Sequence, residues 1–375
     1  MTNNSGFDTQ EILGGIREWV EIESPTDTPE ATNRMADKVE ADFAAHGGKI
    51  DRIAGTQGFG DCLKVRTPWG GDGKGILVLS HIDTVHPIGT LERLPFRVEG
   101  DIAYGPGIFD MKGGAYLGFH AFRNYCRQGK ETPLPITFLF NTDEEMCSRS
   151  SRDLIIAEAH KHKYVLVLEP ARDGGNVVGA RKGTARFVLD IQGRPAHSGS
   201  RHADGRSAIK ELARQIIDIE SMTDYERELT VNVGVISGGS RPNVIPEFAS
   251  AEVDMRLPTK ALADEMIPKV AGLKSYDPDV TIKVSGGAER PPFEQTEAGV
   301  ALFEHARKVG AELGMNLEAV KAGGASDANF AGPITPALDG LGVNGDGAHT
   351  MNEQITVSLL AQRAELFYRL LGSLE

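Results

Sequence analysis

The sequence predicts an α/β fold in which a larger, doubly wound domain is interrupted by a smaller α+β domain. Apolar runs alternate with helical segments in the first half of the chain, half-buried strands begin near residue 181, and the first pattern returns after about residue 288. The chain has 375 residues, whereas single domains usually hold about 100 to 200. We therefore expect a discontinuous domain at 1–180 and 289–375, and an inserted domain at 181–288.

The first domain begins with two predicted helices and continues with buried strands. Apolar residues recur at helical spacing over 12–20 and stop before Pro25, which disfavours a helix at the residue before it. A second helix is expected over 29–45, and another over about 111–128. Three continuous apolar runs indicate strands covered on both faces, as in a largely parallel sheet: 75–80, 135–140 and 164–168.

The inserted segment has a different pattern of apolar residues. Residues 185–191 alternate between apolar and mostly polar side chains, which is typical of a strand with one face toward water. The predicted order is strand, helix, strand, strand, helix, strand, which is the ferredoxin-like arrangement: 185–191, 206–222, 229–236, 248–256, 260–273 and 280–285. After the insert we expect helices at 299–313 and 354–371, with a glycine-rich loop at 323–328 between them.

Charge and composition exclude several classes of protein. The net charge of -13, with no basic stripe, argues against a nucleic-acid partner. No run of about 18 apolar residues indicates a membrane span, and residues 1–5 lack the basic start of a signal peptide. Cys62, Cys126 and Cys147 have no ligand-like spacing and cannot all pair within one chain. These features favour a cytoplasmic protein without a membrane partner.

Metal-seeking side chains follow three of the predicted strands. His81 follows the first, the turn 143–145 follows the second, and Glu169 follows the third. Because ligands bind at the carboxyl ends of the strands in an open α/β sheet, we expect these side chains to converge. Asp110, in a glycine-bounded turn, and His349, in a glycine-rich segment, complete a set of acceptors suited to zinc.

The chemistry of a two-metal site accounts for this set. Two zinc ions about 3.5 to 4 Å apart need a carboxylate between them and further ligands on each side. Glu144 remains for proton transfer, and Asp83 can accept the second N–H of the neighbouring imidazole. Each residue alone also fits a plain role, such as a helix cap or a loop histidine, but charges at the ends of apolar strands favour a site. The candidate ligands are His81, Asp110, Glu145, Glu169 and His349.

Four motifs resemble those of a known family. They lie at 80–85, 105–114, 141–145 and 193–199. The chain resembles the di-zinc family of aminoacylases, acetylornithine and succinyl-diaminopimelate deacylases and glutamate carboxypeptidases over nearly its whole length. It looks most like the bacterial glutamate carboxypeptidases, which remove C-terminal glutamate from folates and other acyl-glutamates.

The resemblance implies a role for each candidate residue at the metals. Glu144 would be the general base, and Asp110 would bridge two ions. His81 and Glu169 would bind one zinc, and Glu145 and His349 the other. Carboxylate and imidazole sites also accept Co²⁺ or Mn²⁺. Cys147 stands where glycine is frequent in the family, and we expect it to be a small buried hydrophobe rather than a ligand.

The resemblance also assigns a role to the inserted domain. In the family, the histidine at the position of His197 reaches from the lid of a second subunit and stabilises the oxyanion. This implies a homodimer formed through residues 181–288. The alternative for His197 is a solvent-exposed loop histidine.

Four further residues are candidates for substrate recognition. Arg290 precedes Pro291, in a segment that resembles the one gripping a substrate carboxylate in glutamate carboxypeptidases. Asn243 and Arg256 match family positions used in recognition, although Arg256 could instead form a structural ion pair at a strand end. Ser326 lies in a loop that the family places beside the substrate, and it could equally cap a helix.

The implied function is zinc-dependent hydrolysis of an amide or peptide bond next to a carboxylate, with a small acyl-amino acid or peptide as substrate. The first expectation is a glutamate carboxypeptidase that acts on acyl- or peptidyl-glutamate. Removal of an acyl group from an amino acid, or cleavage of a dipeptide, is the alternative within the same chemistry. A metal-binding or assembly protein without catalysis is a third hypothesis, which the presence of Glu144 disfavours.

Overall fold

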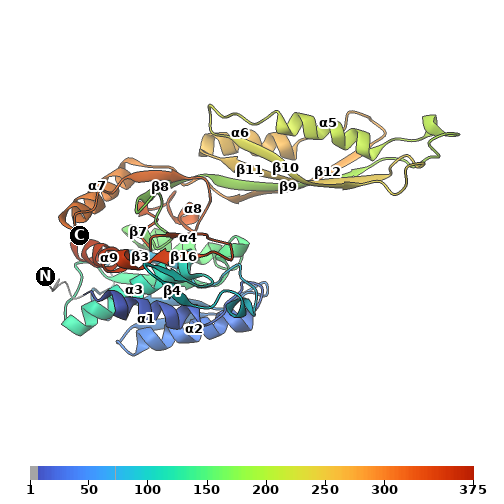
Figure 1. The fold of residues 1–375 in the computed structure, drawn as a ribbon. Coiled ribbons are helices and arrows are strands. Elements are labelled where there is room, and N and C mark those ends of the chain that lie inside the picture. Colours follow the sequence, from blue (N-terminus) through green and yellow to red (C-terminus); the bar gives the residue numbers. More distant parts are fainter. Residues whose placement is uncertain (1–6, 72) are drawn as a thin grey trace. The chain divides into compact units, whose positions relative to one another are not determined.

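The computed structural model describes residues 7–71 and 73–375, and it divides into two compact units (Figure 1). The larger unit contains the residues up to Ala180, Gln295–Ala322 and Ser326–Glu375, and the inserted unit contains Arg181–Glu294 with Gly323–Ala325. The predicted boundary at 288 falls inside strand β12 (Thr281–Arg290), which belongs to the inserted unit. The expectation about a signal peptide concerned residues 1–5, which lie outside the described residues.

The larger unit is built on a six-stranded mixed sheet. The four strands on one side of it are parallel, which agrees with the doubly wound pattern, whereas β1 and β2 form an antiparallel edge that the sequence analysis missed. In sheet order the strands are β1 (Lys49–Ile53), β2 (Cys62–Arg66), β6 (Ile136–Asn141), β3 (Ile76–His81), β7 (Tyr164–Val167) and β14 (Ala337–Leu338).

Helices cover both faces of this sheet (Figure 1). On one face Phe43 of α2 packs at tilted and edge-on angles against rings of α3 and β6, and this aromatic packing joins the helices to the strands. Ile76 and Leu77 face opposite sides of β3 and are both fully buried, which explains the continuous apolar run. The helices are α1 (Thr9–Val20), α2 (Pro29–Ala44), α3 (Gly113–Gln128) and α9 (Leu360–Ser373) on one face, α4 (Arg152–Lys161) and α8 (Ala328–Ala331) on the other, and α7 (Glu297–Glu312) beside β14.

A small antiparallel sheet pairs a segment near the C-terminal end of the chain with residues 97–104. Its strands, in order, are β15 (Gly345–Asp346), β16 (Gln354–Thr356), β5 (Ile102–Tyr104) and β4 (Arg97–Glu99). The predicted last helix was wrong at its start: 354–356 form β16, and α9 begins at Leu360. The β-branched residues Ile355, Thr356 and Val357 favour an extended chain there. A second small pair joins β8 (Val177–Arg181) to β13 (Ala319–Ala322).

The inserted unit has the predicted ferredoxin-like order. Its four strands are antiparallel in the order β10-β11-β9-β12, and α5 and α6 pack on one face of the sheet. Phe187 and Leu189 of β9 are buried against the helices while Val188 between them is exposed. The elements are β9 (Gly183–Gln192), α5 (Ala208–Glu220), β10 (Thr230–Gly238), β11 (Phe248–Leu257), α6 (Lys260–Ala271) and β12 (Thr281–Arg290).

Within the described residues, no helix has the length and apolar character that would let it cross a membrane.

Candidate metal centre

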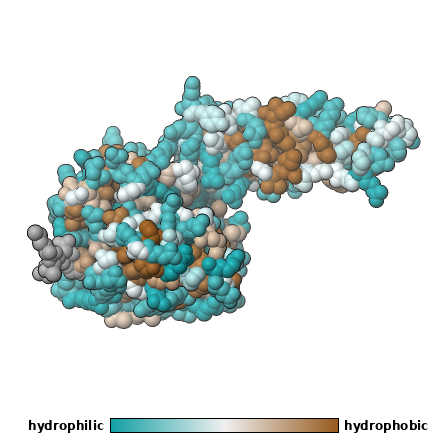
Figure 2. All heavy atoms as spheres, viewed as in Figure 1, coloured by the Kyte–Doolittle hydropathy of each residue, from teal (hydrophilic) through white to brown (hydrophobic). Residues whose placement is uncertain are grey.

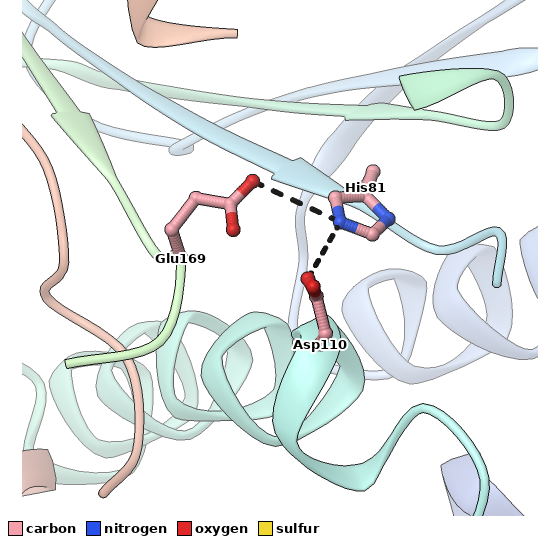
Figure 3. Close-up of side chains that lie close together, drawn as sticks. All are labelled: His81, Asp110 and Glu169. Carbon is pink, nitrogen blue, oxygen red and sulfur yellow. Dashed lines mark hydrogen bonds and ion pairs between the residues drawn. The ribbon is translucent and has the colours of Figure 1, made fainter. Parts of the chain in front are cut away.

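The first group of metal-ligating side chains lies at the carboxyl ends of β3 and β7. His81 is the last residue of β3, and its ring is buried. Nε2 of His81 lies 3.2 Å from Oδ1 of Asp110 and 3.8 Å from Oε1 of Glu169, so both carboxylates point toward the same ring nitrogen (Figure 3). β3 and β7 are parallel neighbours, and their ends therefore meet at one edge of the sheet.

A second group shares Asp110 with the first. Nε2 of His349 lies 3.1 Å from Oε2 of Glu145 and 3.3 Å from Oδ2 of Asp110. In each group the candidate ligand atoms all lie within 4.8 Å of one another. Asp110 thus offers Oδ1 to His81 and Oδ2 to His349. This arrangement places one carboxylate between two sets of ligands.

The donor atoms fit divalent metal ions. Two imidazoles and three carboxylates form a nitrogen and oxygen set that zinc, cobalt and manganese all accept. Oε1 of Glu145 is buried and has no hydrogen-bond partner among the described residues. Buried polar atoms are nearly always paired, so an ion at this position would satisfy an oxygen that the protein itself leaves unsatisfied.

Without an ion, the imidazoles and carboxylates of the site perturb one another. Hydrogen bonds to Asp110 and then to Glu145 raise the pKa of His349 to about 10. Burial opposes the charge on His81, but its bonds to Asp110 and Asp83 outweigh that effect and raise its pKa well above the usual value. Burial also opposes the charge on Asp110, yet the two histidines hold the pKa of this carboxyl far below its usual range. These shifts favour protonated imidazoles beside the carboxylates when no ion is bound.

Asp83 contacts residues of both ligand groups, His81 in the first and Glu145 in the second. Its backbone oxygen lies 3.0 Å from Nδ1 of His81, and its carboxylate Oδ1 lies 3.4 Å from the same nitrogen. The carboxylate also accepts the backbone N–H groups of Glu144 at 3.3 Å and Glu145 at 3.2 Å, and the hydroxyl of Thr26 at 2.8 Å. A fully buried carboxylate therefore orients the His81 ring and fixes the turn that carries Glu144 and Glu145.

The turn after β6 separates Glu144 from Glu145. Residues 144–146 form a single 3₁₀ turn, and Cys147 and Ser148 follow with φ values of 66° and 50°. Oε2 of Glu145 lies 3.1 Å from Nε2 of His349, whereas Glu144 belongs to neither group of candidate ligands. The charge of Glu144 lies close enough to His81 to contribute to its raised pKa. Cys147 is only half-buried, which differs from the buried position expected for it.

Two buried carboxylates that the sequence analysis did not single out hold the ligand-bearing turns. Glu353 accepts the backbone N–H of Asp110 at 2.9 Å. Asp327 accepts a hydrogen bond from Asn141 at 2.8 Å and another from Ser148, beside the Glu144 turn. The only feature of the sequence that could have indicated these two residues is their position near candidate site residues. Glu353 lies four residues after His349, and Asp327 follows Ser326 in the glycine-rich loop.

In the inserted unit, His197 and Asn243 lie on adjoining loops. The His197 side chain is exposed, and its Nδ1 accepts the backbone N–H groups of Gly199 at 3.1 Å and Ser200 at 3.2 Å. Because Nδ1 is an acceptor, the neutral ring carries its proton on Nε2. The backbone oxygen of Asn243 accepts the N–H of Ser198 at 3.1 Å. His197 therefore presents an N–H donor outward.

The other three recognition candidates have different surroundings. Arg290 is buried at the end of β12, opposite Thr184 of β9. Arg256 forms the ion pair that the sequence left open, with two bonds to Asp254 at 2.7 and 3.1 Å. Ser326 is fully buried, and its hydroxyl donates to Asp339 at 2.7 Å and accepts the N–H of Ala328 at 3.1 Å. The Ser326 hydroxyl thus has the capping contact that was its alternative.

Comparisons with known proteins agree on one family. The sequence profile described as "Peptidase family M20/M25/M40" matches residues 77–373. Carboxypeptidase G2 from Pseudomonas sp. (strain RS-16) is 31% identical over 376 residues, covering 97% of this chain and 89% of that protein. Aminopeptidase PepT from Bacillus cereus has a TM-score of 0.80 at 22% identity, over 98% of this chain and 99% of that one. A dinuclear metal-binding M20 peptidase from Bacillus subtilis has a TM-score of 0.69 at 15% identity, over 97% of each chain.

Metal binding is predicted to release protons near neutral pH. The raised pKa values of His81 and His349 keep both imidazoles protonated without an ion, whereas a metal binds only the neutral ring. We expect roughly two protons to leave when both positions fill, and affinity to rise with pH as fewer protons must be displaced. Zinc titration calorimetry in buffers of different ionisation enthalpy measures this release.

The control for proton release replaces one histidine at a time. His349→Asn should reduce the release to roughly one proton. His160→Asn, at an exposed position on α4, should leave it unchanged. A binding heat that does not depend on the buffer contradicts the prediction.

Proposed function

Because the chain belongs to peptidase family M20/M25/M40 and is a metallohydrolase, we propose that it is a glutamate carboxypeptidase. It would hydrolyse the amide bond between an acyl or peptidyl group and a C-terminal glutamate. The observation that carries this proposal is the pair of ligand groups that share Asp110, with Glu144 beside them. The 31% identity to carboxypeptidase G2 over most of both chains supports the choice of substrate.

The proposed roles at the metals follow from the two groups. Asp110 would bridge two ions, because each of its oxygens faces a different histidine. When bound, a pair of zinc ions lowers the pKa of a bound water and polarises the amide carbonyl. The remaining ligands would be His81 and Glu169 for one ion and Glu145 and His349 for the other.

Proton transfer in this proposal is the work of Glu144. Its carboxylate takes a proton from the attacking water and returns it to the leaving amine nitrogen. Asp83 maintains the backbone of the Glu144 turn, and thus the position of this base. His197 would donate a hydrogen bond from Nε2–H to the oxyanion that develops on the carbonyl.

Recognition of glutamate is assigned to the inserted unit. A glutamate product carries two carboxylates, and a planar guanidinium can bind a carboxylate through two parallel hydrogen bonds. Arg290 is the proposed partner, with the amide of Asn243 as a second polar contact. Arg256 and Ser326 are weaker candidates, because Asp254 and Asp339 already engage their polar groups.

The inserted unit also offers a surface for a second copy of the chain. Strand β10 lies at the edge of its sheet, and Val235 and Ile236 on it are 55% and 64% exposed. Ile217 on the neighbouring helix α5 is 69% exposed, and Figure 2 shows hydrophobic side chains gathered over α5 and β10. Unpaired edges and exposed apolar patches favour association. We assign this surface to the homodimer contact.

Glu144→Gln should strongly reduce turnover while the protein keeps its metal. The amide cannot accept a proton, so kcat for an acyl-glutamate should fall about 10²- to 10⁴-fold. Asp153→Asn, at an exposed position in the first turn of α4, is the control and should retain activity. Metal content is measured in parallel. A wild-type protein that binds metal and cleaves no acyl-amino acid would instead support the non-catalytic alternative.

Arg290→Lys should raise KM selectively for acyl-glutamates. Replacing a two-bond contact by a single point charge removes a charge-assisted hydrogen bond, for which we expect an increase of about ten-fold or more. KM for acetylated amino acids with one carboxylate should change little. Arg227→Lys, in an exposed ion pair with Glu265, is the matched control. An equal rise for both substrate classes would favour the deacylase or dipeptidase alternative.

Ile236→Lys should convert a dimer into monomers. A charge on the outward face of β10 opposes burial of that strand against a second copy. Sedimentation velocity measures the assembly, and activity should fall with it because His197 would act on the partner's substrate. Val98→Lys, at a 46% exposed position in the larger unit, is the control. A wild-type monomer with full activity overturns this proposal.

A further inference from the structure

Glu353 is a buried carboxylate that the proposed mechanism does not use. It is 1% exposed and stands directly before β16, four residues after His349. Its Oε1 accepts the backbone N–H groups of Phe109 and Asp110, each at 2.9 Å. Its Oε2 accepts the N–H of Gly107 at 2.8 Å and lies 2.6 Å from Nε2 of His86. Four donors therefore converge on one carboxylate.

Three of these donors belong to the turn that carries Asp110. Gly107 has a left-handed φ of 69°, and Asp110 has φ -118° and ψ 94°, which is not helical. The N–H groups of such a turn have no regular ladder to join, and a buried N–H without an acceptor is destabilising. The Glu353 side chain supplies the acceptors, so the backbone conformation at Asp110 depends on it.

The same residue fastens this turn to the segment that carries His349. The backbone oxygen of Glu353 accepts the N–H of Gly105 at 3.3 Å, and β16 pairs with β5 just before the turn. Side chain and main chain of Glu353 thus hold the two segments in register. The distance of 3.3 Å between Oδ2 of Asp110 and Nε2 of His349 is set across this connection.

We propose that Glu353 is a positioning residue for the metal centre, which sets Asp110 against His349 and is itself held by His86. The inference rests on the proposed function in one respect, because it takes Asp110 as the shared ligand. The ion held by Asp110, Glu145 and His349 depends on Glu353 more than the ion held by His81 and Glu169. His81 ends β3 and Glu169 lies two residues after the end of β7, and Glu353 belongs to neither strand.

Glu353→Gln tests this role with little change in volume. An amide offers one acceptor atom where the carboxylate offers two, and its NH₂ faces donors that no longer have a partner. We expect one of the two zinc ions to bind about 10- to 100-fold more weakly, as is typical when the support of a ligand is removed. Affinities are measured by competition with a chromophoric chelator, and kcat should fall more than KM changes.

The matched control is Glu211→Gln in the inserted unit. Glu211 is 2% exposed and accepts the backbone N–H groups of Tyr276 and Asp277 and the side chain of Gln215, so it occupies a comparable environment. Its replacement can lower the unfolding midpoint but should leave both zinc affinities unchanged. A purely structural role for Glu353 would produce this same result, a loss of stability without a loss of affinity.

His86→Phe keeps the inference testable if Glu353→Gln does not fold. It retains a ring and removes one of the four donors, so a smaller loss of affinity at the same ion is expected. Wild-type affinity for both ions in every folded variant would overturn the inference. Asp110→Asn separates this outcome from failure of the proposed function: if it also retains both ions, the ligand set is wrong, and if it loses them, only the role of Glu353 fails.

Discussion

The candidate metal centre depends on the burial of many carboxylates close together. Asp110, Glu145 and Glu169 lie within two overlapping groups, and Asp83 and Glu353 lie directly behind them. Two like charges 4 Å apart repel by about 4 kcal/mol at an effective dielectric constant of 20. Such a cluster is stable only where cations or N–H donors offset the repulsion between its charges. Two protonated histidines do so when no metal is bound, and divalent ions can replace them.

The carboxylates fall into two kinds according to what faces them. Those of Asp83 and Glu353 accept hydrogen bonds from backbone N–H groups, which also fix the local chain. The carboxylates of Asp110 and Glu145 face each other and the imidazoles, and one oxygen of Glu145 has no partner among the described residues. Backbone N–H groups therefore stabilise the supporting carboxylates of Asp83 and Glu353. The carboxylates of the candidate ligands Asp110 and Glu145 remain available to a cation.

The sequence predicted those parts of the site that follow from local pattern. Apolar runs ending in His81 and Glu169 indicated strands whose ends meet, and the alternation over 185–191 indicated the half-buried first strand of the insert. The pairing of β16 with β5 and the bonds of Glu353 join residues more than 200 positions apart. No local periodicity records such contacts. For the same reason 354–356 were assigned to a helix, although they pair as a strand.

The two units differ in the chemistry that their polar groups can perform. In the inserted unit, Nδ1 of His197 accepts two backbone N–H groups, so protonating it would break both bonds. The neutral ring therefore offers Nε2–H as a hydrogen-bond donor. In the larger unit, the backbone N–H of Glu144 donates to Asp83, which anchors the turn that carries this carboxylate. In the proposed mechanism the base and the oxyanion donor are therefore separate residues, each held by backbone hydrogen bonds of its own unit.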